Sequence, residues 1–224
     1  MKSKILSFAI LISFIVLAGC EFDNFEQPGS TLTGTVNYNG TAVGVRSGAT
    51  QLELWQYGFQ TRAKIPVNIA QDGTFTATLF DGDYKLVRLA GAPWQSQTDS
   101  IDVKVSGRTT LDVPVTPYYT LTNETFTNAS GTINSSVKVN KIGTAAITSL
   151  TLYVGITNIV DANNNSQNTT LNAAALTDLS TAKTQSIALN TANKARSYIY
   201  VRIGVLCAGS TERFYTPVQK ITLQ

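Results

Sequence analysis

The chain has 224 residues, with 17 Lys and Arg against 14 Asp and Glu and no histidine at all. The formal charge of +3 falls to +1 once Lys2 and Lys4 of the first segment are set aside, and no basic run is interleaved with aromatics, which excludes a nucleic-acid-binding protein. Without histidine, neither the Ser-His-Asp and Cys-His catalytic groups nor the common zinc sites can be built. We therefore expect no enzyme, no metal and no cofactor.

Residues 1–19 form the predicted export signal of a lipoprotein. The apolar run 5–17 would span roughly 20 Å as a helix, short of a bilayer core of about 30 Å. The LAGC sequence at 17–20 places small residues before a cysteine, so we expect Cys20 to become the lipid-bearing N-terminus of an outer-membrane protein exposed at the cell surface. An ordinary signal peptide with an incidental cysteine is the alternative. Lipidation leaves Cys207 without a disulfide partner, and its apolar setting predicts a buried small hydrophobe.

Residues 20–29 are acidic and without periodicity, which predicts a tether, and residues 30–116 form the first of two predicted β-sandwich domains. Short segments with period-two alternation predict its strands at 31–38, 51–57, 64–70, 74–80, 84–89, 101–105 and 109–115. Pro66 and Pro114 cannot donate to a ladder, so we expect their strands to lie at sheet edges or to be bulged.

Pro117 interrupts this pattern, and residues 117–224 are rich in Asn, Thr, Ser and Ala. The clearest strands of this half are predicted at 136–139, 146–156, 184–189, 197–206 and 213–222. Their spacing favours a second sandwich of the immunoglobulin or fibronectin type. At the end of a polar insertion at 161–178, residues 172–179 suit one or two helical turns. The predicted fold class is all-β, with two consecutive β-sandwich domains.

Four aromatic residues are candidate glycan contacts. Trp55, Tyr57 and Phe59 cluster around Gly58, and Trp94 lies in a polar stretch. Flat, exposed rings stack on sugar faces because the apolar C–H patch and the ring leave water together. The alternative for Trp55 and Tyr57 is a place in the core, since both lie on one face of the predicted strand.

The DANNN sequence at 161–165 has oxygen ligands at alternate positions, as a calcium loop would. Ser166 stands where such a loop needs glycine, and Asn172 stands where it needs a bidentate Glu. We therefore predict a plain solvated loop and no metal site.

Two further patterns involve carboxylates and a hydroxyl. The DSI sequence at 99–101 fits the loose Asp-Ser/Thr-aliphatic pattern of O-glycosylation in exported Bacteroidetes proteins, which makes Ser100 a candidate acceptor. Asp81 and Asp83 are near neighbours, as in a glycosidase pair, but their sequence suits a turn better. A carboxylate-dependent hydrolase is the weakest of the functional alternatives.

Several motifs together carry a family resemblance: the lipobox with its acidic tail, LTGTV at 32–36, DGTF at 72–75, LFDGDY at 79–84 and VPVTPY at 113–118. They resemble the two-domain Bacteroidetes lipoproteins of unknown function that commonly accompany SusC/SusD-like glycan importers. The resemblance implies an N-terminal sandwich of the transthyretin or carboxypeptidase-regulatory type. It also implies a non-catalytic accessory protein that binds or scaffolds glycans in a polysaccharide-uptake system. It covers the chain from Cys20 to about residue 120.

A fimbrial or adhesin subunit is the alternative function. Bacteroidetes pilins resemble this chain in being lipoproteins with two transthyretin-like sandwiches, and they mature by cleavage after an arginine, which frees a groove for a donated strand. Arg46 and Arg62 are the available positions, and Arg46 lies in a predicted loop at 41–47.

Overall fold

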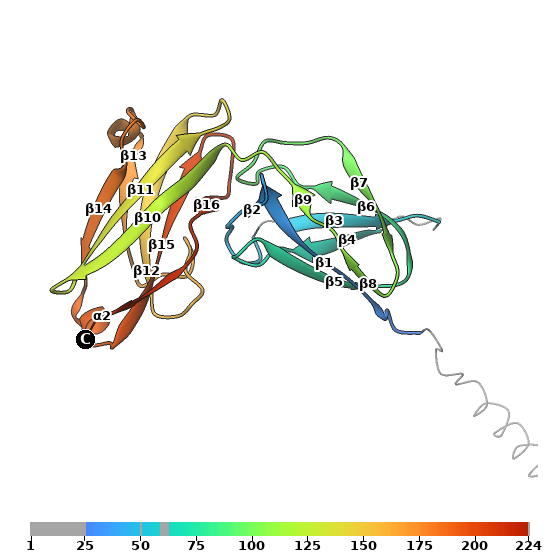
Figure 1. The fold of residues 1–224 in the computed structure, drawn as a ribbon, viewed down its shortest axis with the longest axis horizontal. Helices are drawn as coiled ribbons and strands as arrows, with labels where there is room; N and C mark the ends of the chain where they lie inside the picture. The colour runs from blue at the N-terminus through green and yellow to red at the C-terminus, as the bar shows by residue number, and fades with distance from the viewer. Residues whose placement is uncertain (1–25, 50, 59–62, 224) are drawn as a thin grey trace, which may run out of the picture.

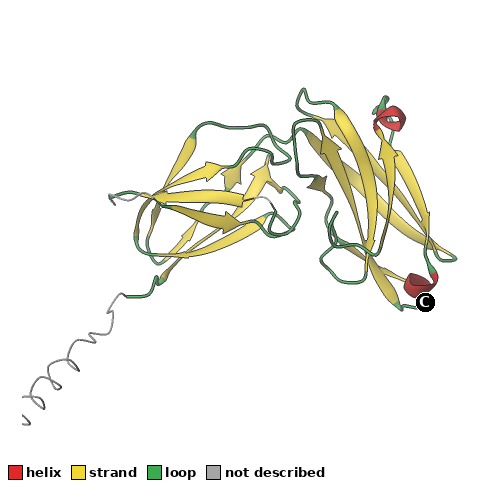
Figure 2. Ribbon diagram, turned by 180° about the vertical axis from the view of Figure 1, so that it is seen from behind, coloured by secondary structure: helices red, strands yellow, loops and turns green. Residues whose placement is uncertain are grey.

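The computed structural model describes residues 26–49, 51–58 and 63–223 as two β-domains that follow one another along the chain (Figure 1, Figure 2). The predicted all-β fold with two sandwich domains is confirmed. The predicted signal segment, Cys20, Phe59 and Arg62 lie outside the described residues. Within the described ranges, no helix is long and apolar enough to cross a membrane.

The N-terminal domain packs two sheets against each other. One sheet has the order β2-β1-β5, with β8 and β9 paired in parallel to β1, and comprises β1 (Ser30–Tyr38), β2 (Thr41–Ala42), β5 (Thr74–Leu79), β8 (Arg108–Thr110) and β9 (Val113–Pro114). The other has the order β4-β3-β6-β7 and comprises β3 (Gln51–Gln56), β4 (Lys64–Asn68), β6 (Gly82–Arg88) and β7 (Ser100–Val105).

Period-two alternation explains how these strands build one core. Leu32 and Val36 of β1 face Leu52 and Leu54 of β3 across the sandwich, and all four are fully buried. The predicted strand 109–115 is interrupted, because its middle leaves the ladder between β8 and β9. The prolines stand where expected, since β4 is an edge strand and β9 pairs only with β1 among the described strands.

The C-terminal domain is a second sandwich. A three-stranded sheet has the order β10-β11-β14 and comprises β10 (Tyr119–Ala129), β11 (Thr132–Lys141) and β14 (Lys183–Ala188). The facing sheet has the order β13-β12-β15-β16, with β17 also paired to β15, and comprises β12 (Ile147–Gly155), β13 (Gln167–Asn172), β15 (Tyr198–Cys207), β16 (Phe214–Tyr215) and β17 (Gln219–Thr222). Two short helical turns are η1 (Ala173–Leu176) and α2 (Thr191–Lys194).

The predicted strands of this half differ from the observed ones in three respects. β10 and β13 were not expected, because their sequences are mostly Thr, Asn and Gln and carry little apolar signal. The expected strand 136–139 is the middle of the ten-residue β11. The expected strand 213–222 is divided into β16 and β17 around Pro217, which has no N–H for the ladder. Cys207 is free and buried, as predicted.

The two domains contact each other through loops, through β16 and through Arg202 in the middle of β15. Gly44 of the N-terminal domain forms an isolated bridge with Tyr215, whose N–H donates to the Gly44 carbonyl at 2.9 Å. Arg46 and Glu212 form an ion pair across the same junction, at 2.7 Å. Because backbone and charged groups pair between the domains, the contact surface is built from polar as well as apolar contacts.

Candidate functional site

The outer face of the β4-β3-β6-β7 sheet carries Trp55 of β3, and Tyr57 follows directly after this strand. Trp55 lies opposite Lys85 of β6, and Lys85 lies opposite Asp102 of β7. Successive residues of a strand point to opposite faces, and the neighbouring Leu54 and Leu86 are fully buried in the core. Trp55 therefore lies on the face directed away from the core, which removes the alternative of a core position.

Trp55 and Tyr57 line a shallow groove on this face. The groove has a volume of about 300 Å³, at the lower end of the range for ligand sites, and its lining includes Lys85, Val87 and Ser100. The Tyr57 side chain is 47% exposed. A ligand in this groove would therefore meet aromatic surface that the fold itself leaves in contact with water.

Two charged residues contact the Tyr57 side chain. The Tyr57 hydroxyl donates to Asp102 Oδ1 at 3.2 Å. Lys85 Nζ lies 3.0 Å from the same carboxylate oxygen and 5.4 Å from the centroid of the Tyr57 ring. Hydrogen bonds with Tyr57 and Asp102 raise the pKa of Lys85, and the bond from Lys85 lowers the pKa of the Asp102 carboxyl. Both groups are thus charged at neutral pH and offer a donor and an acceptor beside the aromatic rings.

Trp94 is a correction to the predicted set of glycan contacts. Its side chain is only 2% exposed, and its backbone bridges Pro117 in the connection between the domains. Next to it, the Gly91 carbonyl accepts a hydrogen bond from Thr211 N at 3.0 Å. The polar stretch around Trp94 is covered by the second domain, a contact that sequence spacing does not reveal. Trp94 is therefore not part of an exposed aromatic surface.

Ser100 lies at the beginning of β7, on the rim of the same groove. Its hydroxyl accepts a hydrogen bond from Lys85 Nζ at 3.4 Å. O-glycosylation of Ser100 stays a prediction, and a glycan attached there would stand beside Trp55 and Tyr57.

The carboxylate of Asp81 has a structural environment. It accepts hydrogen bonds from the hydroxyls of Ser30 and Ser106 and from Gly107 N, and the Ser30 bond is the main cause of the lowered pKa of Asp81. These contacts tie the beginning of β1 to the turn after β7. Among the described residues, no group of three or more acidic, Cys or His side chains is arranged to hold a metal.

The expectation of a solvated loop at 161–165 is wrong for its first residue, since Asp161 is fully buried. Asp161 Oδ1 accepts from Asn163 N at 2.8 Å and from Asn164 N at 2.9 Å. The backbone of the loop folds over the carboxylate and satisfies it, so burial costs little. The carboxylate oxygens of Asp161 therefore accept hydrogen bonds from their own loop, which occupy the positions that a cation would need.

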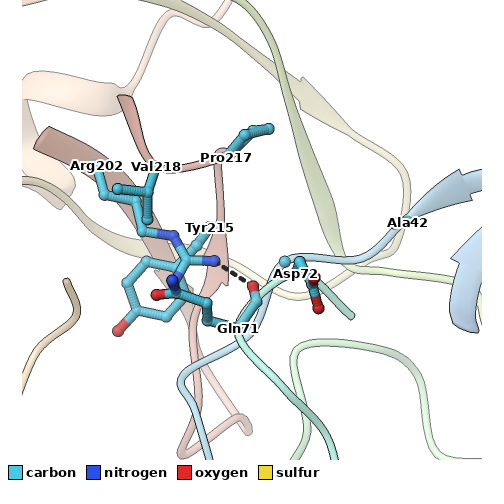
Figure 3. A pocket seen from close by; sticks show the side chains of 8 residues that line it. Ala42, Gln71, Asp72, Arg202, Tyr215, Pro217 and Val218 are labelled. Atoms are coloured by element: carbon cyan, nitrogen blue, oxygen red, sulfur yellow. Dashed lines mark hydrogen bonds between the residues drawn. The ribbon is translucent and has the colours of Figure 1, made fainter. Parts of the chain in front are cut away.

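A second cavity lies between the two domains, and its residues were not predicted from the sequence (Figure 3). It has a volume of about 310 Å³ and is lined by Ala42, Gly44, Gln71, Asp72, Arg202, Tyr215, Pro217 and Val218. Arg202 is the central residue, and it is 1% exposed. A sequence signal did exist, because Arg202 is the one charged residue within the otherwise apolar run of β15.

The Arg202 guanidinium joins the two domains. It donates to the carbonyls of Val45 at 3.0 Å and Gln71 at 2.6 Å in the N-terminal domain, and to those of Val160 at 3.3 Å and Thr216 at 2.7 Å in its own domain. Burial lowers the pKa of Arg202 to about 10, so the group is charged at neutral pH. The charge is therefore buried against backbone carbonyls from both domains.

Arg46, a predicted cleavage position of a pilin, is held at this junction. Its Nη2 and Nε donate to the two carboxylate oxygens of Glu212, at 2.7 and 3.2 Å. The hydrogen bond with Glu212 is the main cause of a raised pKa of Arg46. A protease would have to break this two-fold contact before reaching the bond after Arg46.

Comparison with known proteins gave matches over both domains. Residues 30–116 match the N-terminal domain of the proteins of unknown function DUF3823, and residues 119–220 match the domain of unknown function DUF3823_C. A DUF3823 family protein from Bacteroides ovatus is 36% identical, covers 87% of this chain and 100% of its own, and superposes with a TM-score of 0.82. One from Parabacteroides merdae is 31% identical, covers 88% and 100%, and has a TM-score of 0.80.

A more distant structure shares the fold. It comes from Bacteroides uniformis, is described as a "putative carbohydrate binding protein", and is 17% identical, with a TM-score of 0.73 over 88% of this chain and 100% of its own. At this identity the likeness concerns the fold alone. No match was found among curated proteins.

Proposed function

This chain belongs to the two-domain DUF3823 family, and from that premise we propose that it is a non-catalytic protein that binds glycans through the face of Trp55 and Tyr57. The observation that carries the proposal is the groove of about 300 Å³ that both rings line on the side of the sheet away from the core. The carbohydrate-binding description of the Bacteroides uniformis neighbour agrees with it.

The chemistry of the groove suits a sugar polymer. The aromatic rings offer apolar surface to the C–H face of a pyranose, and Lys85 and Asp102 offer a donor and an acceptor to its hydroxyls. The open shape of a sheet face admits a chain that continues in both directions. We therefore assign the groove to an internal stretch of a polysaccharide.

The cellular setting is part of the proposal. A lipid on Cys20 would hold the protein at the outer membrane, where it would capture polysaccharide for a SusC/SusD-like transporter. Labelling of cells with radioactive palmitate tests this directly, and the label is expected on the wild type and absent from a Cys20→Ala variant. Equal labelling of both forms would contradict the anchor.

Affinity electrophoresis of the full chain in gels containing a panel of polysaccharides tests glycan binding. Tyr57→Ala should weaken retention by roughly 2- to 13-fold, because a stacked ring contributes about 0.5–1.5 kcal/mol beyond its area. Tyr198→Ala is the matched control, since Tyr198 is 40% exposed and also has a lysine, Lys220, over its ring. Retention that is absent with every polysaccharide, or equal for Tyr57→Ala and the wild type, would refute the proposal.

A further inference from the structure

We propose that the cavity between the two domains is a second carbohydrate site, which holds one neutral sugar ring. The inference rests on the proposed function, and it assigns to the interdomain cavity a ligand different from that of the Trp55 groove. Its residues come from both domains, with Ala42, Gly44, Gln71 and Asp72 on one side and Arg202, Tyr215, Pro217 and Val218 on the other (Figure 3).

The size of the cavity limits the ligand. Its volume of about 310 Å³ corresponds to about ten water molecules at roughly 30 Å³ each, which leaves room for one sugar ring with its hydroxyls. The cavity has both apolar and polar lining residues. Ala42, Pro217 and Val218 supply apolar surface, whereas Asp72 and Arg202 supply polar groups (Figure 3). A ring with one apolar face and several hydroxyls matches both walls.

Two polar groups of the cavity have bonding capacity that the fold leaves unused. Asp72 accepts from Thr74 N at 3.0 Å and from Thr74 Oγ1 at 2.7 Å, and both bonds go to Oδ1, so Oδ2 is the oxygen for a ligand hydroxyl. The four hydrogen bonds of Arg202 use Nε once, Nη1 twice and Nη2 once. A guanidinium has five N–H groups, so one on Nη2 is left for a ligand oxygen.

Glycine at position 44 leaves space beside that nitrogen, although the Tyr215 ring packs against the guanidinium with the ring centroid 4.4 Å from its Cζ. A Cβ added to Gly44 would lie 3.0 Å from Arg202 Nη2 and 2.4 Å from the Tyr215 carbonyl oxygen. The φ angle of Gly44 is not in the positive region, so backbone conformation does not require a glycine here. Glycine is required at position 44 because the second domain approaches closely and because a side chain would take the space beside Arg202 Nη2.

The charges of the cavity select against ionic ligands. Arg202 contributes one positive charge and Asp72 one negative charge, and no other lining residue is charged. Within the described ranges, no carboxylate lies within 4.0 Å of Arg202, so Asp72 and Arg202 attract each other without forming an ion pair, and both line the cavity. An acidic sugar would be attracted by one group and repelled by the other, whereas neutral hydroxyls can donate to Asp72 and accept from Arg202.

Isothermal titration calorimetry on the full chain in mild detergent tests this site. The probes are the methyl glycosides of glucose, galactose, mannose and N-acetylglucosamine, with glucuronate as the acidic comparison. At least one neutral glycoside should bind, at least 10-fold more tightly than glucuronate. The proposal is overturned if no neutral glycoside binds or if glucuronate binds more tightly.

Two variants locate the binding. Ala42→Phe fills the cavity from an exposed strand position, and Asp72→Asn keeps the side-chain shape but removes its charge. Each should weaken glycoside binding by 10-fold or more, and Asp72→Asn should also reduce the discrimination against glucuronate. The unfolding temperature of each variant verifies that it is folded. Unchanged glycoside affinity in a folded Ala42→Phe protein would also overturn the assignment.

Trp55→Ala separates this site from the groove. It should leave glycoside affinity unchanged while weakening retention by polysaccharide. If polysaccharide is retained and no glycoside binds, only the cavity proposal fails. If a glycoside binds in the cavity and no polysaccharide is retained, only the groove proposal fails. Equal loss of glycoside binding in Trp55→Ala and Ala42→Phe would refute a separate second site.

Discussion

Replacement of Arg202 by methionine should loosen the junction between the two domains. The methionine side chain keeps much of the apolar stem of arginine but has no donor. Four carbonyls would each lose one donor, those of Val45 and Gln71 across the junction and those of Val160 and Thr216 in the same domain, and the Gln71 carbonyl would keep its bond from Val45 N. Val45, Val160 and Thr216 are buried, as is Arg202 itself, so their carbonyls would be left short of a donor inside the protein.

Two opposing contributions set the size of the effect. Hydrogen bonds to a charged group are worth about 1.5–3 kcal/mol each, so the four bonds contribute roughly 6–12 kcal/mol. Against this, burial lowers the pKa of Arg202 to about 10. Each unit by which the pKa lies below the ordinary value of 12.5 for a guanidinium corresponds to about 1.4 kcal/mol. Burial of the charge therefore costs the folded state about 3 kcal/mol. The hydrogen bonds outweigh the cost, and we expect Arg202→Met to destabilise the protein by about 3 kcal/mol or more.

Tryptophan fluorescence during denaturant unfolding measures this effect at the junction itself. The chain has two tryptophans, and Trp94 is buried beside the interdomain connection. In a Trp55→Phe background, Trp94 alone reports on the junction. We expect its transition to occur at lower denaturant in Arg202→Met than in the parent, and before the loss of β-structure measured by circular dichroism.

Arg196→Met is the matched control, because Arg196 is exposed and should change the free energy of unfolding by less than 0.5 kcal/mol, as is usual at the surface. The reasoning would be refuted if Arg202→Met lay within about 1 kcal/mol of the parent and its two probes still reported one coincident transition. That result would mean that the buried guanidinium adds nothing to the cohesion of the domains.

Two other substitutions test single contacts. Gly44→Ala places a Cβ 2.4 Å from the Tyr215 carbonyl oxygen, so it should cost about 1–3 kcal/mol in the same fluorescence assay, whereas Gly29→Ala, which meets nothing within 4 Å, should be neutral. Asp81→Asn should lower the unfolding temperature at pH 7, because hydrogen bonds from Ser30 and Gly107 lower the pKa of Asp81 in the folded state. That stabilisation is present above the ordinary carboxyl pKa and is lost as the pH falls through the lower folded value. The variant and the wild type should therefore converge as the pH is lowered past the ordinary carboxyl pKa, and a difference that stays constant over the same titration would show that the charge is irrelevant.

Strands were predictable from the sequence wherever alternation placed apolar residues on one face. Val103 and Val105 of β7 are buried and Asp102 and Lys104 are exposed, as the period-two pattern indicates. β10 was not predictable by the same means, because only Tyr119 and Leu121 of its eleven residues are buried. Its place in the sheet depends on hydrogen bonds with β11, and a single sequence carries no direct signal of that pairing.

The candidate sites were predictable only in part, for a related reason. Trp55 and Tyr57 were identified as residues of one strand face, but whether that face met the core or solvent depended on the neighbouring strands. For Trp94 and Arg202, the missing information was the contact between the two domains. The surroundings of each include residues of both domains, so the local sequence of one domain misrepresents the exposure of Trp94 and conceals the partners of Arg202.

The two proposed sites stand at different distances from the predicted anchor. Tyr57 N donates to the Asp83 carbonyl at 3.0 Å, and the adjacent turn residue Asp81 holds Ser30, where β1 begins. The Tyr57 end of the groove thus lies near the start of β1, whereas the Arg202 cavity lies at the junction with the C-terminal domain, where Figure 1 places β2 beside β16. A ten-residue tether extends at most roughly 35 Å, so a lipid on Cys20 would keep the Tyr57 end of the groove within that reach of the membrane surface. A polymer held in the groove would then lie where a membrane transporter can reach it, while the cavity would meet sugar units farther from the cell.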